Sequence, residues 1–174
     1  GVENLPYKSL LEPILGNLLL DFGGTVMTRA TQTNRSVFKT KSNALVAPVI
    51  CYESMYGEFM TDYVRNGAQL IAIITNDGWW GNSPGHKQLL SYSRLRSIEL
   101  RRSIVRSANT GISALINEKG DIINSIEYEK NGIINDKISI SNKLTFYAKY
   151  GDFISRISLF FFIIIFLFYF AKKK

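Results

Sequence analysis

The chain has 174 residues, of which 13% are aromatic, and a formal net charge of +7 at pH 7. This length allows one domain with its own hydrophobic core. A single cysteine excludes an internal disulfide, and with only one histidine it argues against a structural zinc site within this chain. The basic charge favours an anionic partner, either nucleic acid or phospholipid headgroups, and the apolar end of the chain favours lipid.

The N-terminal part of the sequence carries no targeting signal. It begins at Gly1 without an initiator Met, and no basic segment precedes an apolar signal core, so we expect a piece of a longer protein. Apolar residues spaced between positions 10 and 18 predict a short helix, with Pro13 in its early turns. Residues 21–35 predict a loop, and residues 36–40 predict an edge strand.

A short apolar strand leads to the only cysteine in the chain. Residues 46–51 are mostly uncharged and partly β-branched, which predicts a buried strand ending at Cys51. Because α/β proteins place their chemistry at strand ends, Cys51 is a candidate nucleophile, which needs a neighbouring base or positive charge to become a thiolate. An extended backbone would point Cys51 and Glu53 the same way, whereas a sharp turn would separate them. The alternative is a buried core cysteine.

The next segments predict a strand, helix and strand in succession. Residues 55–66 have one apolar helical stripe and residues 69–75 form a second buried strand, so we expect a βαβ unit in a parallel sheet. A loop over residues 76–85 precedes a helix over residues 86–102. We expect that helix to turn Leu89, Tyr92, Leu95 and Ile98 inward, and Arg94, Arg101 and Arg102 mostly outward.

The following segment predicts further strands. Residues 103–108, 111–117 and 121–126 have strand patterns, and the turn at 118–120 joins the last two as a hairpin. Residues 131–140 predict another edge strand.

The end of the sequence predicts a membrane span. Residues 153–171 contain one charge, that of Arg156, and would form roughly 28 Å of helix at about 1.5 Å per residue. This nearly matches a bilayer core of about 30 Å, and Arg156 near one end would reach the headgroups. Residues 172–174 are lysines, which place the C-terminus in the cytoplasm and the globular part outside it. The alternative is a buried core helix.

Motifs spread along the sequence carry a resemblance to a known family. They are Cys51-Tyr52-Glu53, residues 75–81 (Thr-Asn-Asp-Gly-Trp-Trp-Gly), 94–99 (Arg-Leu-Arg-Ser-Ile-Glu), 106–113 (Arg-Ser-Ala-Asn-Thr-Gly-Ile-Ser) and 145–152 (Thr-Phe-Tyr-Ala-Lys-Tyr-Gly-Asp). In this order they resemble the apolipoprotein N-acyltransferase family of the nitrilase superfamily, the carbon-nitrogen hydrolases. The resemblance implies an α/β fold: a partial nitrilase-like α/β sandwich over residues 1–152, one transmembrane helix over 153–171 and a basic cytoplasmic tail over 172–174.

The same resemblance assigns roles to individual residues. The family uses a Glu-Lys-Cys triad, in which Cys51 matches the nucleophile, while the base Glu and the Lys would lie before the first residue. Glu3 fits the place of a further functional Glu, whereas Lys8 and Glu12 do not match the motif. Glu53 would orient or polarise the site, the alternative being a carboxylate paired with a basic residue such as Arg106.

Other residues are supporting candidates. The backbone N–H of Tyr52, directly after the nucleophile, is a candidate donor to an oxyanion. Trp79 and Trp80 suit an acyl chain or a membrane interface, and ordinary packing under a loop is their alternative. The arginines of the helix over 86–102 would meet phosphate headgroups or form a solvated face. His86 receives no role, and Asn109 either holds the loop near the nucleophile or occupies a turn.

The function implied is acyl transfer in the inner membrane of a bacterium, with no cofactor and no metal. A phospholipid would donate an acyl chain to Cys51 as a thioester, and the N-terminal amine of a diacylglyceryl-cysteine lipoprotein would accept it. Without the upstream Glu and Lys, this chain by itself would be inactive. One alternative is a membrane-anchored nitrilase-like amidase that passes the acyl group to water, and another is a non-catalytic fragment.

Overall fold

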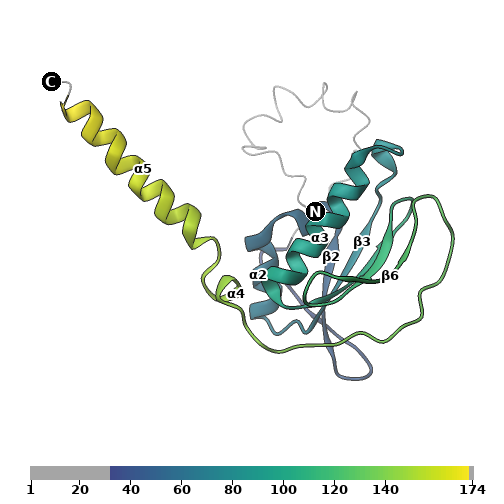
Figure 1. The fold of residues 1–174 in the computed structure, drawn as a ribbon. Coiled ribbons are helices and arrows are strands. Elements are labelled where there is room, and N and C mark those ends of the chain that lie inside the picture. Colours follow the sequence, from purple (N-terminus) through teal and green to yellow (C-terminus); the bar gives the residue numbers. More distant parts are fainter. Residues whose placement is uncertain (1–31, 173–174) are drawn as a thin grey trace, which may run out of the picture. The chain divides into compact units, whose positions relative to one another are not determined.

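The fold contains one mixed sheet in the described part of the chain. The computed structural model describes residues 32–172, except for the side chain of Trp80; the predicted helix near residues 10–18 and most of the predicted loop lie outside this range. The chain divides into two compact units, residues 1–34 and 35–174, and every described helix and strand belongs to the second. The sheet has the order β1-β2-β3-β4-β5-β6 (Figure 1). Its strands are β1 (Phe38–Lys39), β2 (Leu45–Ile50), β3 (Leu70–Thr75), β4 (Ser103–Ala108), β5 (Ser113–Ile116) and β6 (Ile122–Ile126).

The centre of the sheet is parallel and its edges are antiparallel. Strands β2, β3 and β4 pair in parallel, with Ile50 opposite Ile74 and Ile73 opposite Arg106. Parallel neighbours need crossover connections, and the helices α2 (Gly57–Arg65) and α3 (Pro84–Leu100) supply them. The predicted βαβ unit, the strands at 103–126 and the hairpin between the last two are therefore confirmed.

Both crossover helices cover the same face of the sheet (Figure 1). Successive right-handed crossovers in one direction place their helices on one side of a sheet. The shared core takes alternate residues of the strands and the facing residues of the helices, among them Ala47, Val49, Ile71, Ile73, Ile104, Met60, Val64, Leu90 and Leu100. On the opposite face, the side chains of Ile50 and Ile74 are 60% and 67% exposed.

The buried face of α3 differs from the one predicted. Tyr92, Leu95 and Ile98 were expected inward, but they are 37%, 41% and 41% exposed. The face turned to the sheet instead includes polar side chains, namely His86, Ser93, Arg96 and Ser97, together with Leu89, Leu90 and Leu100. Apolar spacing indicated the wrong face because polar side chains can be buried where they have partners inside the protein. The two serines do: Ser93 donates to Leu89 O and Ser97 donates to Arg94 O.

Arg102 is buried, contrary to the expectation that it points outward. Arg101 adopts a left-handed conformation with φ 49° and ends α3, and the next side chain enters the protein with 1% exposure. The guanidinium of Arg102 donates to the carbonyls of Ala68, Leu100, Arg101 and Lys143, at 2.6–3.3 Å. Burial lowers the pKa of Arg102 from its usual value. This one side chain therefore satisfies carbonyls from separate parts of the chain.

The segment after β6 is irregular until it reaches two helices. Residues 131–140 form no strand, so that prediction is wrong. The short helix α4 (Phe146–Tyr150) leads to α5 (Phe153–Lys172), whose first turn is capped by the carboxylate of Asp152 accepting from Ser155 N and Oγ. These hydrogen bonds from Ser155 lower the pKa of Asp152.

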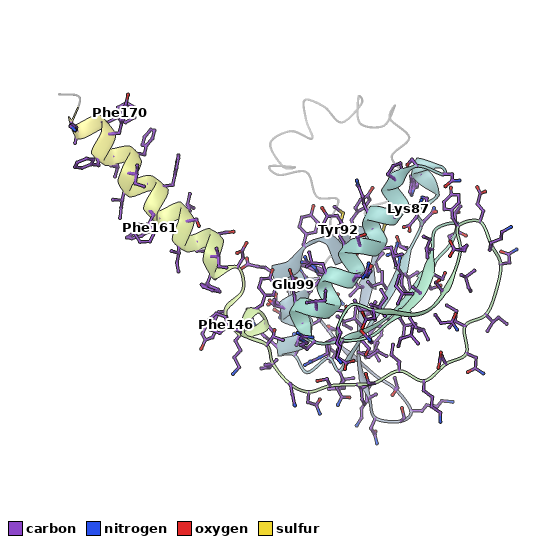
Figure 2. The ribbon with its side chains drawn as sticks, in the orientation of Figure 1. Lys87, Tyr92, Glu99, Phe146, Phe161 and Phe170 are labelled. Atoms are coloured by element: carbon purple, nitrogen blue, oxygen red, sulfur yellow. The ribbon has the colours of Figure 1, made fainter. Side chains whose placement is uncertain are left out.

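Helix α5 is long and apolar enough to cross a membrane. Its side chains project from all sides of the helix, and none is buried in the described part of the chain (Figure 2). This exposure is opposite to that of the buried core helix considered as the alternative. An aqueous setting would leave Phe161, Phe170 and their apolar neighbours in water.

We expect Arg102→Met to lower the free energy of unfolding by about 2–4 kcal/mol, because buried carbonyls lose their donor. Chemical denaturation monitored by circular dichroism measures this. Arg101→Met is the matched control, since the Arg101 side chain is exposed and its only described hydrogen bond goes to Glu118 O at 3.2 Å. A loss for Arg102→Met no larger than the control's would contradict a stabilising role for the buried guanidinium.

Candidate functional site

Cys51 lies on a sharp turn at the carboxyl end of β2. It is the first residue of a 3-10 helix, η1 (Cys51–Met55), and its φ of 51° is left-handed. That conformation costs a non-glycine residue roughly 1–2 kcal/mol. The turn stops the strand abruptly and leaves the thiol free and partly exposed at the strand end. Cys51 is therefore not sealed in the core.

Strand pairing brings Cys51 next to Thr75. Because Ile50 pairs with Ile74, the residues that follow them, Cys51 and Thr75, lie side by side at the ends of the two strands. The Thr75 hydroxyl lies 3.3 Å from Cys51 Sγ and 2.7 Å from Asp77 Oδ1. The backbone N–H of Asn109 donates to Thr75 O at 3.0 Å, so the loop after β4 also contacts this strand end. Asn109 itself lies in a bend, and this contact comes from its backbone, so it does not separate the two predicted roles of its side chain.

A buried ion pair lies behind Thr75. The guanidinium of Arg106 contacts the carboxylate of Asp77, and their side chains are 1% and 0% exposed. Arg106 also donates to Ile112 O and to Ser93 Oγ, each at 3.2 Å. Gly111 makes room for this arrangement, since a Cβ there would overlap the Asp77 carboxylate. The ion pair therefore joins the loop after β3 to β4.

Reading the sequence alone assigned no role to Thr75 and Asp77, and Arg106 was expected only as a partner for Glu53. The sequence nevertheless contained a signal for this contact. The motif at 75–81 begins at the last residue of β3, and the motif at 106–113 begins within the neighbouring strand β4. A carboxylate in one motif and an arginine in the other indicate a possible ion pair. What the sequence did not supply was the register that brings them together.

Glu53 turns back toward the strand rather than lying extended beside Cys51. Its Oε2 accepts a hydrogen bond from Ile50 N at 2.8 Å, and the residue is 7% exposed. The backbone after Cys51 therefore forms the sharp turn, and the extended arrangement with Cys51 and Glu53 on one face does not occur. Arg106, the alternative partner expected for Glu53, pairs with Asp77. The Glu53 carboxylate therefore stabilises the turn on which Cys51 lies.

The other candidates occupy the surroundings of this turn. Tyr52 follows Cys51 in η1, and Trp79 lies in a second 3-10 helix, η2 (Gly78–Trp80), with 77% of its surface exposed. The side chain of Trp80 and the whole of Glu3 lie outside the described residues. Trp79 is therefore not packed under its loop within the described part of the chain.

His86 lies in the first turn of α3, which starts two residues earlier than predicted, at Pro84, and the side chain is buried. Its ring is 1% exposed and stacks on Tyr128, with ring centroids 4.4 Å apart. Partial burial raises the pKa of Tyr128, and the carboxylates of Glu129 and Asp77 raise it further. Within residues 32–172, no group of three or more His, Cys, Asp and Glu side chains could hold a metal ion.

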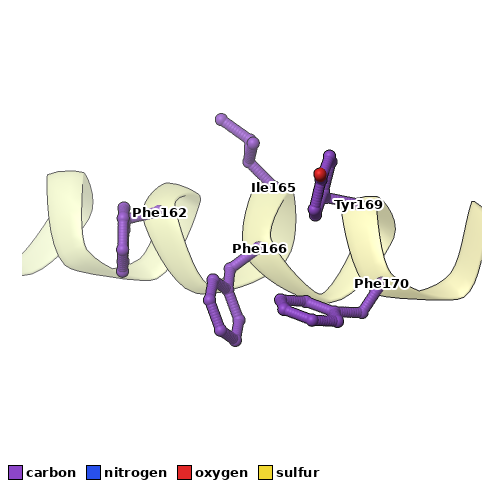
Figure 3. A pocket seen from close by; sticks show the side chains of 5 residues that line it. All are labelled: Phe162, Ile165, Phe166, Tyr169 and Phe170. Atoms are coloured by element: carbon purple, nitrogen blue, oxygen red, sulfur yellow. The ribbon is translucent and has the colours of Figure 1, made fainter. Parts of the chain in front are cut away.

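Two hollows occur elsewhere in the described part of the chain. An open groove of about 370 Å³ lies between side chains of α5, namely Phe162, Ile165, Phe166, Tyr169 and Phe170 (Figure 3). A polar hollow of about 240 Å³ lies between α2 and the start of α5 and is lined by Glu58, Phe59, Thr61, Asp62, Arg65 and Arg156. Cys51 lines neither of these two hollows. The candidate site therefore consists of the turn at Cys51 and the buried side chains of Thr75, Asp77 and Arg106 behind it.

Comparison with known proteins places the chain among enzymes of one family. The family model described as carbon-nitrogen hydrolase matches residues 8–142. The chain is 33% identical over 150 residues to the apolipoprotein N-acyltransferase of Shewanella oneidensis, covering 86% of this chain and 28% of that protein. It is 36% identical over 151 residues to the protein of the same name from Bradyrhizobium diazoefficiens, covering 86% and 27%.

The chain thus spans less than a third of the length of these curated relatives. Among solved structures, an amidase from Nesterenkonia sp. is similar, with a TM-score of 0.48 and 15% sequence identity over 58% of this chain and 40% of that one.

We expect Cys51→Gly to be more stable than Cys51→Ala by about 1 kcal/mol, because only glycine adopts the left-handed conformation without strain. Both variants lack the sulfur, so chemical denaturation of the pair isolates the backbone effect. At Val49, which is buried within β2, Gly in place of Ala should have the opposite sign. Equal stability of the two Cys51 variants would show that the turn is unstrained.

Proposed function

We propose a function from the premise that this chain belongs to the carbon-nitrogen hydrolase family. The resemblance to apolipoprotein N-acyltransferases is confirmed by curated relatives, and we infer that the chain forms part of such an enzyme. It would carry the nucleophile that moves an acyl chain from a phospholipid to a lipoprotein. The observation that supports this most directly is Cys51 itself, a partly exposed thiol on a strained turn at a strand end.

Two half-reactions at Cys51 Sγ account for the transfer. The general base takes the proton of the Cys51 thiol, and the thiolate attacks the carbonyl carbon of the phospholipid acyl ester. The bond to the glycerol oxygen then breaks, and that oxygen leaves with the proton returned by the base. The resulting thioester is then attacked by the N-terminal amine of a diacylglyceryl-cysteine lipoprotein. The C–S bond breaks, the amine passes a proton to the general base and an amide forms, while Cys51 returns as a thiolate. Such a sequence gives ping-pong kinetics.

The neighbours of Cys51 have separate roles in this mechanism. The backbone N–H of Tyr52 would donate to the oxyanion of each tetrahedral intermediate. Glu53 supports the turn through its hydrogen bond to Ile50 N. The general base Glu and the Lys that assists the oxyanion would come from outside this chain, and Glu3 would be a further functional carboxylate. The chain alone would therefore be inactive.

The membrane would present the acyl donor to this site. We assign residues 1–152 to the catalytic domain, 153–171 to a transmembrane helix and 172–174 to a cytoplasmic tail. The Glu58 carboxylate supports this arrangement, because it accepts from Asp152 N at 2.8 Å and from the Arg156 guanidinium, and so ties α2 to the start of α5. Trp79 and Trp80 would contact the acyl chain on the extracytoplasmic side of the bacterial inner membrane.

In the complete protein, we expect Cys51→Ser to lower lipoprotein N-acylation at least a thousandfold, because a serine hydroxyl is a far weaker nucleophile without a strong base beside it. Mass spectrometry of the wild-type protein incubated with phospholipid alone should find one acyl group on Cys51. Ser91→Ala, at an exposed position of α3, is the control and should keep full activity.

Wild-type turnover by Cys51→Ser would remove Cys51 from the mechanism. Offering a lipopeptide amine and water together separates the proposed activity from an amidase. Free fatty acid as the main product would favour the hydrolase, and N-acylated lipopeptide would favour the transferase.

The orientation can be tested with single cysteines in a Cys51→Ala background of the complete protein, after removal of any other cysteines. We expect a membrane-impermeant maleimide to label Lys137→Cys, an exposed position of the globular part, in cells with a permeable outer membrane. Lys174→Cys should react only after the inner membrane is opened, because the C-terminal lysines stay in the cytoplasm. The reverse labelling pattern would overturn this topology.

A further inference from the structure

The Thr75 hydroxyl lies between two groups that both accept hydrogen bonds. Its oxygen is 3.3 Å from Cys51 Sγ and 2.7 Å from Asp77 Oδ1. A hydroxyl has one proton and donates it to one acceptor at a time. The direction of this single hydrogen bond must therefore depend on which acceptor carries the greater negative charge.

The buried ion pair decides how strongly Asp77 competes for that proton. Asp77 is fully buried, and Arg106 contacts its other carboxylate oxygen, Oδ2. The paired guanidinium offsets the negative charge of the carboxylate, so Asp77 keeps a donor when the Thr75 hydroxyl turns away. Without Arg106, releasing the hydroxyl would leave a buried charge with no partner in this network, which is strongly unfavourable.

We infer that Thr75 is a positioning residue that tunes the reactivity of Cys51, an inference that rests on the proposed role of Cys51 as nucleophile. While the thiol is protonated, the Thr75 hydroxyl donates to Asp77. When the sulfur becomes a thiolate, the hydroxyl rotates and donates to the sulfur, since hydrogen bonds to ionised acceptors are the stronger ones. The proton remains on Thr75 throughout, so no group is transferred in this step.

Local structure restricts Thr75 to this task. The pairing of β2 with β3 fixes its backbone beside Cys51, and the N–H of Asn109 holds its carbonyl. A β-branched side chain also has few χ1 rotamers. With 5% exposure, the hydroxyl is shielded from most competing water. A stabilising hydrogen bond to the thiolate is consequently pre-organised before any acyl donor arrives.

Thr75→Val tests the inference because it removes the hydroxyl at nearly constant volume. In the complete protein at neutral pH, we expect single-turnover thioester formation with phospholipid to slow about 10- to 100-fold, the effect of losing one hydrogen bond to a charged group. The phospholipid concentration that half-saturates this single turnover should stay unchanged, because Thr75 acts on the sulfur and not on lipid binding. Thr75→Ser, which restores a hydroxyl, should stay within about threefold of the wild type on the same reasoning.

Thr61→Val is the matched control, since Thr61 is also buried and donates to a backbone carbonyl, that of Glu58 at 2.6 Å in α2. Both valine variants should lose thermal stability, but only Thr75→Val should slow thioester formation. Alkylation of Cys51 by iodoacetamide without lipid provides a second measurement, and it should slow in Thr75→Val and recover in Thr75→Ser. If Thr75→Val does not fold, Thr75→Ala is compared with Thr61→Ala in the same way.

The results separate this inference from the function on which it rests. If Cys51→Ala abolishes acyl transfer while Thr75→Val forms the thioester and is alkylated at the wild-type rate, Thr75 has no positioning role. If Cys51→Ala retains acyl transfer, the proposed function fails, and the alkylation rates alone still test the contact between Thr75 and Cys51. Equal slowing by Thr61→Val and Thr75→Val would also overturn the inference, because it would indicate a general loss of structure.

Discussion

The buried ion pair between Asp77 and Arg106 is the interaction on which the site depends. Removing one partner of a buried pair typically costs about 3–5 kcal/mol, because the other charge is left in the interior. Here the pair also fixes the loop after β3 against β4 and holds the acceptor of the Thr75 hydroxyl. The pairing of Ile50 with Ile74 then places Thr75 beside Cys51, where its hydroxyl lies 3.3 Å from the sulfur.

The turn at Cys51 combines strain with support. The left-handed backbone of Cys51 is unfavourable, and it persists because the groups around it are fixed. Glu53 binds Ile50 N on one side of the turn, and Ser54 donates to Cys51 O at 2.8 Å on the other. A sulfur held in this way needs little reorganisation when it reacts, which suits a nucleophile serving two successive half-reactions.

The junction between α2 and α5 links this site to the apolar helix. Glu58 bonds to both Asp152 and Arg156, and Arg65 donates to Ala148 O at 2.7 Å, so the short helix α4 is also attached to α2. Exposed ion pairs contribute little to stability by themselves. Their value here is geometric, since several contacts near one point restrict how the segment before α5 can move relative to α2.

The sequence by itself determined the strands, the crossover helices, the motifs and the apolar helix, because these follow from local periodicity, spacing and composition. It also singled out Cys51. Only the tertiary structure decided that Arg102 and the polar face of α3 are buried, that residues 131–140 form no strand, and that Thr75, Asp77 and Arg106 converge behind the sulfur. The physical reason is that burial of a polar group depends on partners distant in sequence, and strand register brings those partners together.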